Sequence, residues 1–194
     1  MQQYNLFVLP KLVVRNFSFF KKLSLSIVLS VLLIGFAQGQ ADNSYRAKQS
    51  GNWNNTNTWE RYNLATTAWV AAVATPSNTN SPSINIPAAY TVTVTANVNI
   101  DQATIDGIVA VNSGITLTVA NGGGTDLTVN SGGTLLNAGT IATAGATVTM
   151  NAGSTYEHTQ NGGTIPTAAW NATATCLVSG VTTTVPAGIN QNFG

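Results

Sequence analysis

The sequence predicts an all-β protein built as a β-solenoid, because a corner motif recurs and short alternating runs lie beside it. Similar phrases begin at Asn112 (NSGIT), Asn130 (NSGGT) and Asn151 (NAGST). Self-similarity at an interval of about 20 residues is typical of solenoids, whose repeats bury their apolar faces only by stacking. The adjacent runs, 116–119, 126–129 and 147–150, alternate with period two, which indicates strands and not helices.

The N-terminal segment, residues 1–39, predicts a signal-peptide helix. Basic residues (Lys11, Arg15, Lys21 and Lys22) precede an unbroken apolar stretch, 23–36. Small residues then favour cleavage after Gly39 or, alternatively, after Ala41. The apolar stretch is shorter than the roughly 20 residues of a comfortable membrane span. We therefore expect a secreted or cell-surface protein that meets the membrane only through this segment; an uncleaved anchor is the alternative.

Residues 40–83 predict an aromatic-rich cap before the solenoid. Aromatic residues are concentrated here among turn-forming residues: Tyr45, Trp53, Trp59, Tyr62 and Trp69. In one interpretation they close the open end of the solenoid, which would otherwise expose apolar core and strand edges. In the other, Trp53, Trp59, Tyr62 and Trp69 form a platform on which sugar rings stack.

Residues 84–194 predict the solenoid itself. The alternation places twelve residues inward: Val92, Val94, Val98, Ile100, Ile105, Leu117, Val119, Leu127, Val129, Leu135, Ile141 and Val148. Asn and Gly recur between the runs, where positive φ is needed and where stacked Asn amides can bond along the ladder. The chain that follows the signal segment is long enough for one domain.

Charge and cysteine content exclude several classes of function. The chain after the signal segment contains three basic and six acidic residues, which gives a net charge of −3. No basic surface is therefore available for nucleic acid. Cys176 is the only cysteine, and no intrachain disulfide can form. It lies in an apolar run and is expected to be buried. We expect no cofactor.

Residues that carry chemistry are few. The run 121–129 approximates a calcium-binding nonapeptide with Asp126 as ligand, but no tandem copy supplies a second Asp, and a plain glycine-rich corner is favoured. The other acids of the solenoid are Asp101, Asp106 and Glu157; the first two could meet across a corner, whereas Glu157 and His158 point to opposite faces. His158, the only histidine, is expected on the surface. We therefore expect no enzyme activity.

Threonine pairs suggest one further binding mode. Thr91 and Thr93, Thr116 and Thr118, and Thr147 and Thr149 could stack into an array that recognises ice or a crystalline polymer. Outward threonine is also common on any solvated strand, and the intervals are uneven.

Four blocks resemble the opening of large secreted surface proteins of the type IX secretion class. They are 50–53 (SGNW), 58–62 (TWERY), 68–70 (AWV) and 90–94 (YTVTV), and the stretch 153–171 is similar to a block of the same proteins. The resemblance implies a right-handed β-helix-like region with an adhesive or scaffolding role. Those proteins continue into further β-domains and a sorting domain, whereas this chain stops at Gly194, which suggests a truncated product or another export route.

The leading functional expectation is a non-catalytic extracellular structural or adhesion module, with carbohydrate binding as the alternative. Partners would be an extracellular surface, a polysaccharide or another surface protein. Residues 186–194 look too short and too polar to form a covering domain, and Phe193 alone covers little of a turn. We therefore expect end-to-end self-association through the last turn.

Overall fold

The computed structural model describes residues 39–194, and these form an all-β solenoid, as the sequence predicts. Apart from one short 3-10 helix, η1 (Thr56–Thr58), every regular element of this part is a strand. The expected signal-peptide helix falls on residues 1–38 and lies outside the described residues. No helix of the described part is long and apolar enough to cross a membrane.

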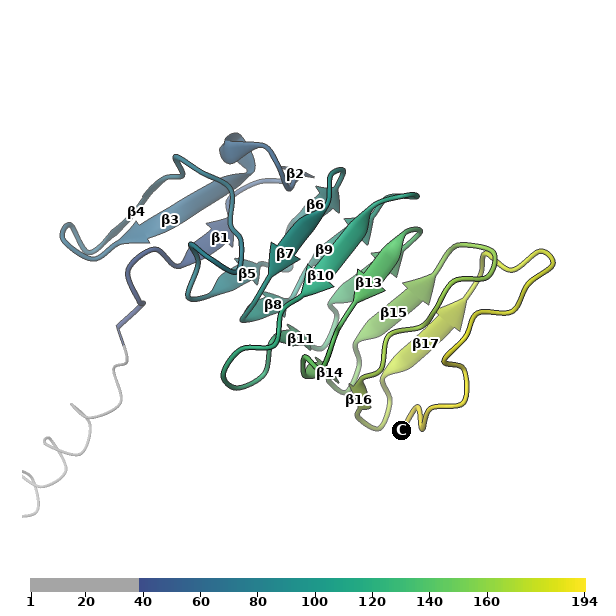
Figure 1. Cartoon of the computed structure of the whole chain (residues 1–194). Coiled ribbons are helices and arrows are strands. Elements are labelled where there is room, and N and C mark those ends of the chain that lie inside the picture. The colour runs from purple at the N-terminus through teal and green to yellow at the C-terminus, as the bar shows by residue number, and fades with distance from the viewer. Residues whose placement is uncertain (1–38) are drawn as a thin grey trace, which may run out of the picture. The chain divides into compact units, whose positions relative to one another are not determined.

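Each full turn of the solenoid contributes one strand to each of three sheets (Figure 1). The first full turn consists of β5 (Ile84–Ile86), β6 (Thr91–Val94) and β7 (Val98–Ile100). The second consists of β8 (Ala103–Ile105), β9 (Ile108–Val111) and β10 (Thr116–Val119), and the third of β11 (Leu127–Val129), β12 (Thr134–Asn137) and β13 (Thr140–Ala142). Two turns with only two strands each follow, β14 (Val148–Met150) with β15 (Thr155–His158), and β16 (Ala169–Trp170) with β17 (Thr175–Val178).

Strands of successive turns pair in parallel register, which aligns the inward residues into columns. Ile84, Ala103, Leu127 and Val148 occupy equivalent positions in one sheet. Of the twelve residues predicted to face inward, eleven are buried and Val98 is half-buried against the same core. Period-two alternation therefore identified the core correctly, because a strand with one face packed inside must point every second side chain there.

The solenoid begins before residue 84, which shifts the expected boundary of the cap. β1 (Tyr45–Ala47) pairs in parallel with β5, and β2 (Gly51–Asn52) pairs with β6. The cap proper is an antiparallel hairpin of β3 (Trp59–Asn63) and β4 (Ala68–Ala71), and β3 pairs antiparallel with β1. The hairpin thus extends one sheet beyond the first turn and occupies the edge that β1 would otherwise leave open.

The corner motifs lie at two different corners of the turn. Asn130 and Asn151 follow the paired strands β11 and β14, so they stack, whereas Asn112 follows β9 on another side. The residue that stacks on Asn130 in the preceding turn is Asp106. Side chains at this corner form a hydrogen-bonded ladder, as expected. Asp106 accepts from Asn130 at 2.7 Å, Asn130 from Asn151 at 2.8 Å, and Asn151 from Asn171 at 3.1 Å.

The C-terminal segment, residues 181–194, packs on the last turns without forming a helix or a domain. The Thr184 carbonyl accepts a hydrogen bond from Gly162 N–H at 2.8 Å, and Ile165 N–H donates to Ala187 O at 2.9 Å. The Phe193 ring packs edge-on against Trp170 with centroids 5.0 Å apart. These contacts, which the sequence does not reveal, cover part of the last turn.

Candidate functional site

The four aromatic residues of the expected sugar platform divide into two separate pairs. Trp53 and Trp59 are buried in the core and pack edge-on, with ring centroids 4.8 Å apart. Their indole N–H groups donate to Pro76 O at 2.9 Å and to Trp53 O at 2.8 Å, respectively. Buried rings with satisfied N–H groups close the N-terminal end of the core, and they present no face to a ligand.

Tyr62 and Trp69 form the second pair, on the outer face of the hairpin. They are cross-strand partners on β3 and β4, half-buried, with ring centroids 5.5 Å apart. The Arg46 guanidinium lies 4.1 Å from the centroid of the Trp69 ring and also forms an ion pair with Glu60 at 2.5 Å. These two rings are the part of the expected platform that solvent can reach.

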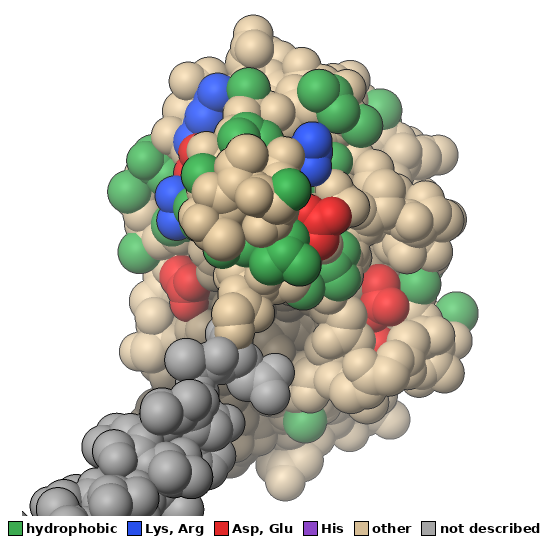
Figure 2. Space-filling model, turned by 90° about the vertical axis from the view of Figure 1, so that its left-hand side faces the viewer, with side chains coloured by type: hydrophobic (Ala, Val, Ile, Leu, Met, Phe, Trp, Pro, Cys, Tyr) green, Lys and Arg blue, Asp and Glu red, His purple; other side chains and the backbone are tan. Residues whose placement is uncertain are grey.

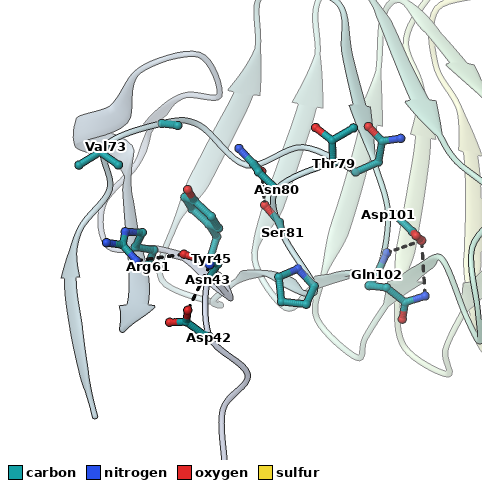
Figure 3. Close-up of a pocket in the computed structure, with 13 residues that line it drawn as sticks. Asp42, Asn43, Tyr45, Arg61, Val73, Thr79, Asn80, Ser81, Asp101 and Gln102 are labelled. Atoms are coloured by element: carbon teal, nitrogen blue, oxygen red, sulfur yellow. Dashed lines mark hydrogen bonds between the residues drawn. The ribbon is translucent and has the colours of Figure 1, made fainter. Parts of the chain in front are cut away.

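A hollow lined by both polar and apolar side chains opens between the hairpin and the first full turn, and Figure 3 shows its lining residues. We call it the N-terminal hollow; its volume is about 740 Å³. Asp42, Asn43, Tyr45 and Arg61 lie on one side, Asp101 and Gln102 on the other, and the loop 73–82 supplies the remainder. On the N-terminal end of the molecule, basic, acidic and hydrophobic side chains are interspersed, without a single-sign patch (Figure 2).

Asp126, the weak calcium candidate, is buried, and both of its carboxylate oxygens accept hydrogen bonds from the chain. Gly122 N–H donates at 2.8 Å, and Thr147 donates through its N–H at 2.7 Å and its hydroxyl at 2.9 Å. Burial alone raises the pKa of Asp126, but these bonds and one to Asp101 outweigh it and hold the pKa below its usual value. The carboxylate therefore ties two successive turns together.

The remaining titratable groups take different partners. Asp106 accepts from Asn85 and Asn130 at the asparagine ladder, whereas Asp101 accepts from Gln102 N–H. Within residues 39–194, no three His, Cys, Asp or Glu side chains are grouped so as to hold a metal ion. Cys176 is half-buried in β17.

His158 is buried, which corrects the expectation that it lies on the surface. Its Nε2 lies 2.7 Å from the Gly162 carbonyl, which can only accept, so Nε2 carries the proton. Nδ1 then accepts from the Tyr156 hydroxyl at 3.1 Å, and Asn137 Nδ2 donates to the same hydroxyl at 3.0 Å. Glu157 faces the opposite side and is reached by Ser179, so the two residues point apart as predicted.

The threonine array considered above does not form, because its members belong to three different sheets. Thr91 and Thr93 lie on β6, Thr116 and Thr118 on β10, and Thr149 on β14. The registers instead align another outward column across the β6–β17 sheet: Thr91, Ile108, Thr134, Thr155 and Thr175. The reading of these residues as ordinary outward threonines on solvated strands therefore holds, since pairs on different sheets cannot stack into one array.

Sequence reasoning missed the N-terminal hollow, although one signal for it was present. Residues 72–83 form a connection without regular strands, between β4 and β5, and loops of that length in compact domains often carry binding sites. No family model, curated protein or solved structure matches this chain.

Proposed function

We propose that this protein is an exported, non-catalytic structural or adhesion module that holds surfaces or other surface proteins through a long β-face. The observation that carries the proposal is the outward face of the β6–β17 sheet. Its aligned columns consist of Thr, Ile, Ala and Leu, with Glu157 as the one charged member among the paired positions. A rigid, weakly charged face of this kind supports contact over an extended area.

Charge substitutions on this face test the adhesion proposal. We expect Thr134→Lys with Thr155→Lys to reduce adsorption of the protein to isolated cell envelopes and immobilised polysaccharides at least tenfold. The matched control is Thr128→Lys with Thr149→Lys, since those two threonines are paired partners on the outward face of another sheet. Equal adsorption of both double variants and the parent would contradict the proposal.

N-terminal sequencing of the exported protein tests the export part of the proposal. Gln40 is expected as the first residue, because cleavage after Gly39 satisfies the small-residue preference of signal peptidases. An intact Met1 in the membrane fraction would support the anchored alternative instead.

A second candidate function, carbohydrate binding, is favoured by the half-buried Tyr62 and Trp69 rings on the hairpin. Flat aromatic faces at a solvated site suit the C–H faces of sugars. A glycan array read with the parent and with Trp69→Ala tests it: loss of glycan signal on an intact fold supports this site. Trp59→Ala is the comparison variant. Because Trp59 is buried, its removal should lower the stability of the fold without removing a contact to the glycan.

The resemblance to surface proteins of the type IX secretion class agrees with both candidates. It adds an expected location at the cell surface and no ligand.

A further inference from the structure

The N-terminal hollow contains polar groups that the fold itself does not use. The Tyr45 hydroxyl and the exposed Asn78 side-chain amide both line the hollow, are accessible to solvent and make no hydrogen bond within residues 39–194. The Nε of Arg61 is buried and also has no hydrogen-bond partner in this part of the chain, while its Nη1 donates to Asn43 Oδ1 at 3.0 Å. Buried polar groups are normally paired, so the unpaired Arg61 Nε, beside an accessible hydroxyl and an accessible amide of the same hollow, points to a ligand or to water.

Several lining residues are held in place by hydrogen bonds with the chain itself. Asp42 accepts from Leu64 N–H at 2.9 Å, and Asp101 accepts from Gln102 N–H at 2.8 Å. Asn80 donates to Thr75 O at 3.0 Å and accepts from Ser77 N–H, which shapes the loop. Asn43 and Gln102 both have positive φ, at 60° and 51°. Non-glycine residues in that region tend to persist where the surroundings fix them, often at binding sites.

The charges of the hollow select against several ligand classes. One cation, Arg61, faces two carboxylates, Asp42 and Asp101, so a phosphate or another strong anion is disfavoured. The wholly apolar lining side chains, Val73, Ala74 and Pro82, are small and lie among polar groups, an arrangement that suits a small ligand with both polar and C–H surface better than a large apolar one. Burial raises the pKa of Tyr45, which Arg61 lowers to a smaller extent, so the hydroxyl stays protonated at neutral pH and can both donate and accept.

We propose that the N-terminal hollow binds a neutral saccharide unit, with Tyr45, Arg61 and Asn78 as hydrogen-bonding groups. Sugar hydroxyls both donate to carboxylates and accept from guanidinium and amide N–H groups, and sugar C–H faces contact small apolar side chains such as Pro82. The volume of about 740 Å³ lies within the range of roughly 300–1,000 Å³ found for small-molecule sites. This proposal rests on the adhesion function proposed above and deepens it, because it names a glycan as one component of the surface that the protein holds. The proposed site is separate from the Tyr62–Trp69 pair.

Titration calorimetry with neutral mono- and disaccharides, on the full chain at sugar concentrations up to about 10 mM, tests the site. We expect at least one sugar to bind with a dissociation constant of about 1 mM. Tyr45→Phe removes only the hydroxyl, and Asn78→Ala removes an exposed amide without a hydrogen bond of its own; each should weaken binding about tenfold or more. Tyr90→Phe, at a half-buried tyrosine that belongs neither to the hollow nor to the Tyr62–Trp69 pair, is the matched control and should not change the affinity. Circular dichroism and urea midpoints confirm that both hollow variants remain folded.

Three outcomes of the sugar titrations would overturn the proposal. They are the absence of binding by every neutral sugar tried, unchanged affinity in both hollow variants, and loss of binding in Trp69→Ala alone, which would move the site to the outer pair. Tighter binding of inorganic phosphate or acetate than of any sugar would also overturn the assignment to neutral saccharides. The adhesion proposal is judged separately, since the sheet-face variants keep the hollow intact.

Discussion

At the scale of single residues, buried polar side chains are organised into small hydrogen-bonded groups within the core. Asn137, Tyr156 and His158 form one such group, and all three side chains are buried. The Tyr156 ring also packs edge-on against Trp170, with centroids 6.2 Å apart. A polar group of this kind is stabilising only while each member keeps its partner, so its ionisation state matters for stability.

Because Tyr156 is buried, we expect the protein to lose stability in alkaline solution. Burial raises its pKa to about 12, although the Asn137 hydrogen bond lowers it and Cys176 adds a small increase. An unfolded tyrosine ionises near pH 10, so between about pH 10 and 12 the unfolded chain binds fewer protons than the folded one. The stabilisation that the protonated Tyr156 hydroxyl gives the folded state is therefore present in full below pH 10 and is lost as the pH rises through that window. The free energy of unfolding should fall by about 2 to 3 kcal/mol in the process.

Urea denaturation at closely spaced pH values between 9 and 12 measures this slope. Tyr45 and Cys176, whose pKa values burial also raises, contribute with the same sign. Tyr156→Phe should therefore be less stable at pH 8 but show a shallower decline with pH than the parent. An identical slope in the variant would show that Tyr156 is not the group responsible.

At the scale of elements, the turns stack so closely that some corners admit no side chain. A Cβ atom at Gly107 would collide with the backbone carbonyl oxygens of Pro87 and Tyr90 in the preceding turn. Those two carbonyls belong to hydrogen bonds of the corner, since Tyr90 O accepts from Ile108 N–H at 3.0 Å. The glycine is required here by close approach of the backbone and not by a positive φ.

Gly107→Ala should therefore separate two turns and lower the free energy of unfolding by about 2 kcal/mol or more. Gly123→Ala is the matched control, because a Cβ atom at that position would meet no atom within 4 Å and the φ of Gly123 is not positive. The control should change stability by less than about 0.5 kcal/mol. Urea midpoints of the two variants compare them directly, and equal midpoints would contradict the close stacking at Gly107.

We also expect the buried and the half-buried aromatic residues of the hairpin to contribute differently to stability. Trp59→Ala removes a fully buried ring and should cost about 3 to 5 kcal/mol. Trp69→Ala removes a half-buried ring and its contact with Arg46, and should cost clearly less. Thermal or urea denaturation measures both. A larger loss in Trp69→Ala would mean that the outer pair, and not the buried one, holds the hairpin in place.

At the scale of the whole described molecule, the two ends of the solenoid differ. The N-terminal end carries the hairpin, with the Arg46–Glu60 ion pair on it. At the other end, no strand of residues 39–194 pairs with the outer edge of β17. Residues 159–194 contain no Asp, Glu, Lys or Arg, and large apolar side chains there are exposed: Leu177, Val178, Val181, Val185 and Ile189. Unpaired edges without charge favour pairing with another chain.

We therefore expect the chain lacking residues 1–39 to self-associate at micromolar concentration through β17. Leu177→Lys places a charge on the outer face of that edge strand and should shift the equilibrium towards monomer by tenfold or more. Thr118→Lys, on β10 in the middle of the solenoid, is the control and should leave it unchanged. Sedimentation velocity across a concentration series measures both, and a parent that stays monomeric at every concentration would contradict the prediction.

The sequence by itself determined which side chains form the core, because period two leaves a strand only one choice of inward face. It also determined the Asn/Gly corners, since these depend on local chemistry, whereas it left two interpretations of the aromatic residues open, a cap and a sugar platform. The tertiary structure decided what depends on the length of each turn. Equivalent inward residues are Ile84, Ala103, Leu127 and Val148, and their spacing along the chain differs from one turn to the next. Position in the turn, and not spacing alone, decides what stacks, so Asn112 follows β9 whereas Asn130 follows β11, and the threonine pairs lie on three sheets. The N-terminal hollow is lined largely by the segment between β2 and β5, which only the tertiary fold places against the first full turn.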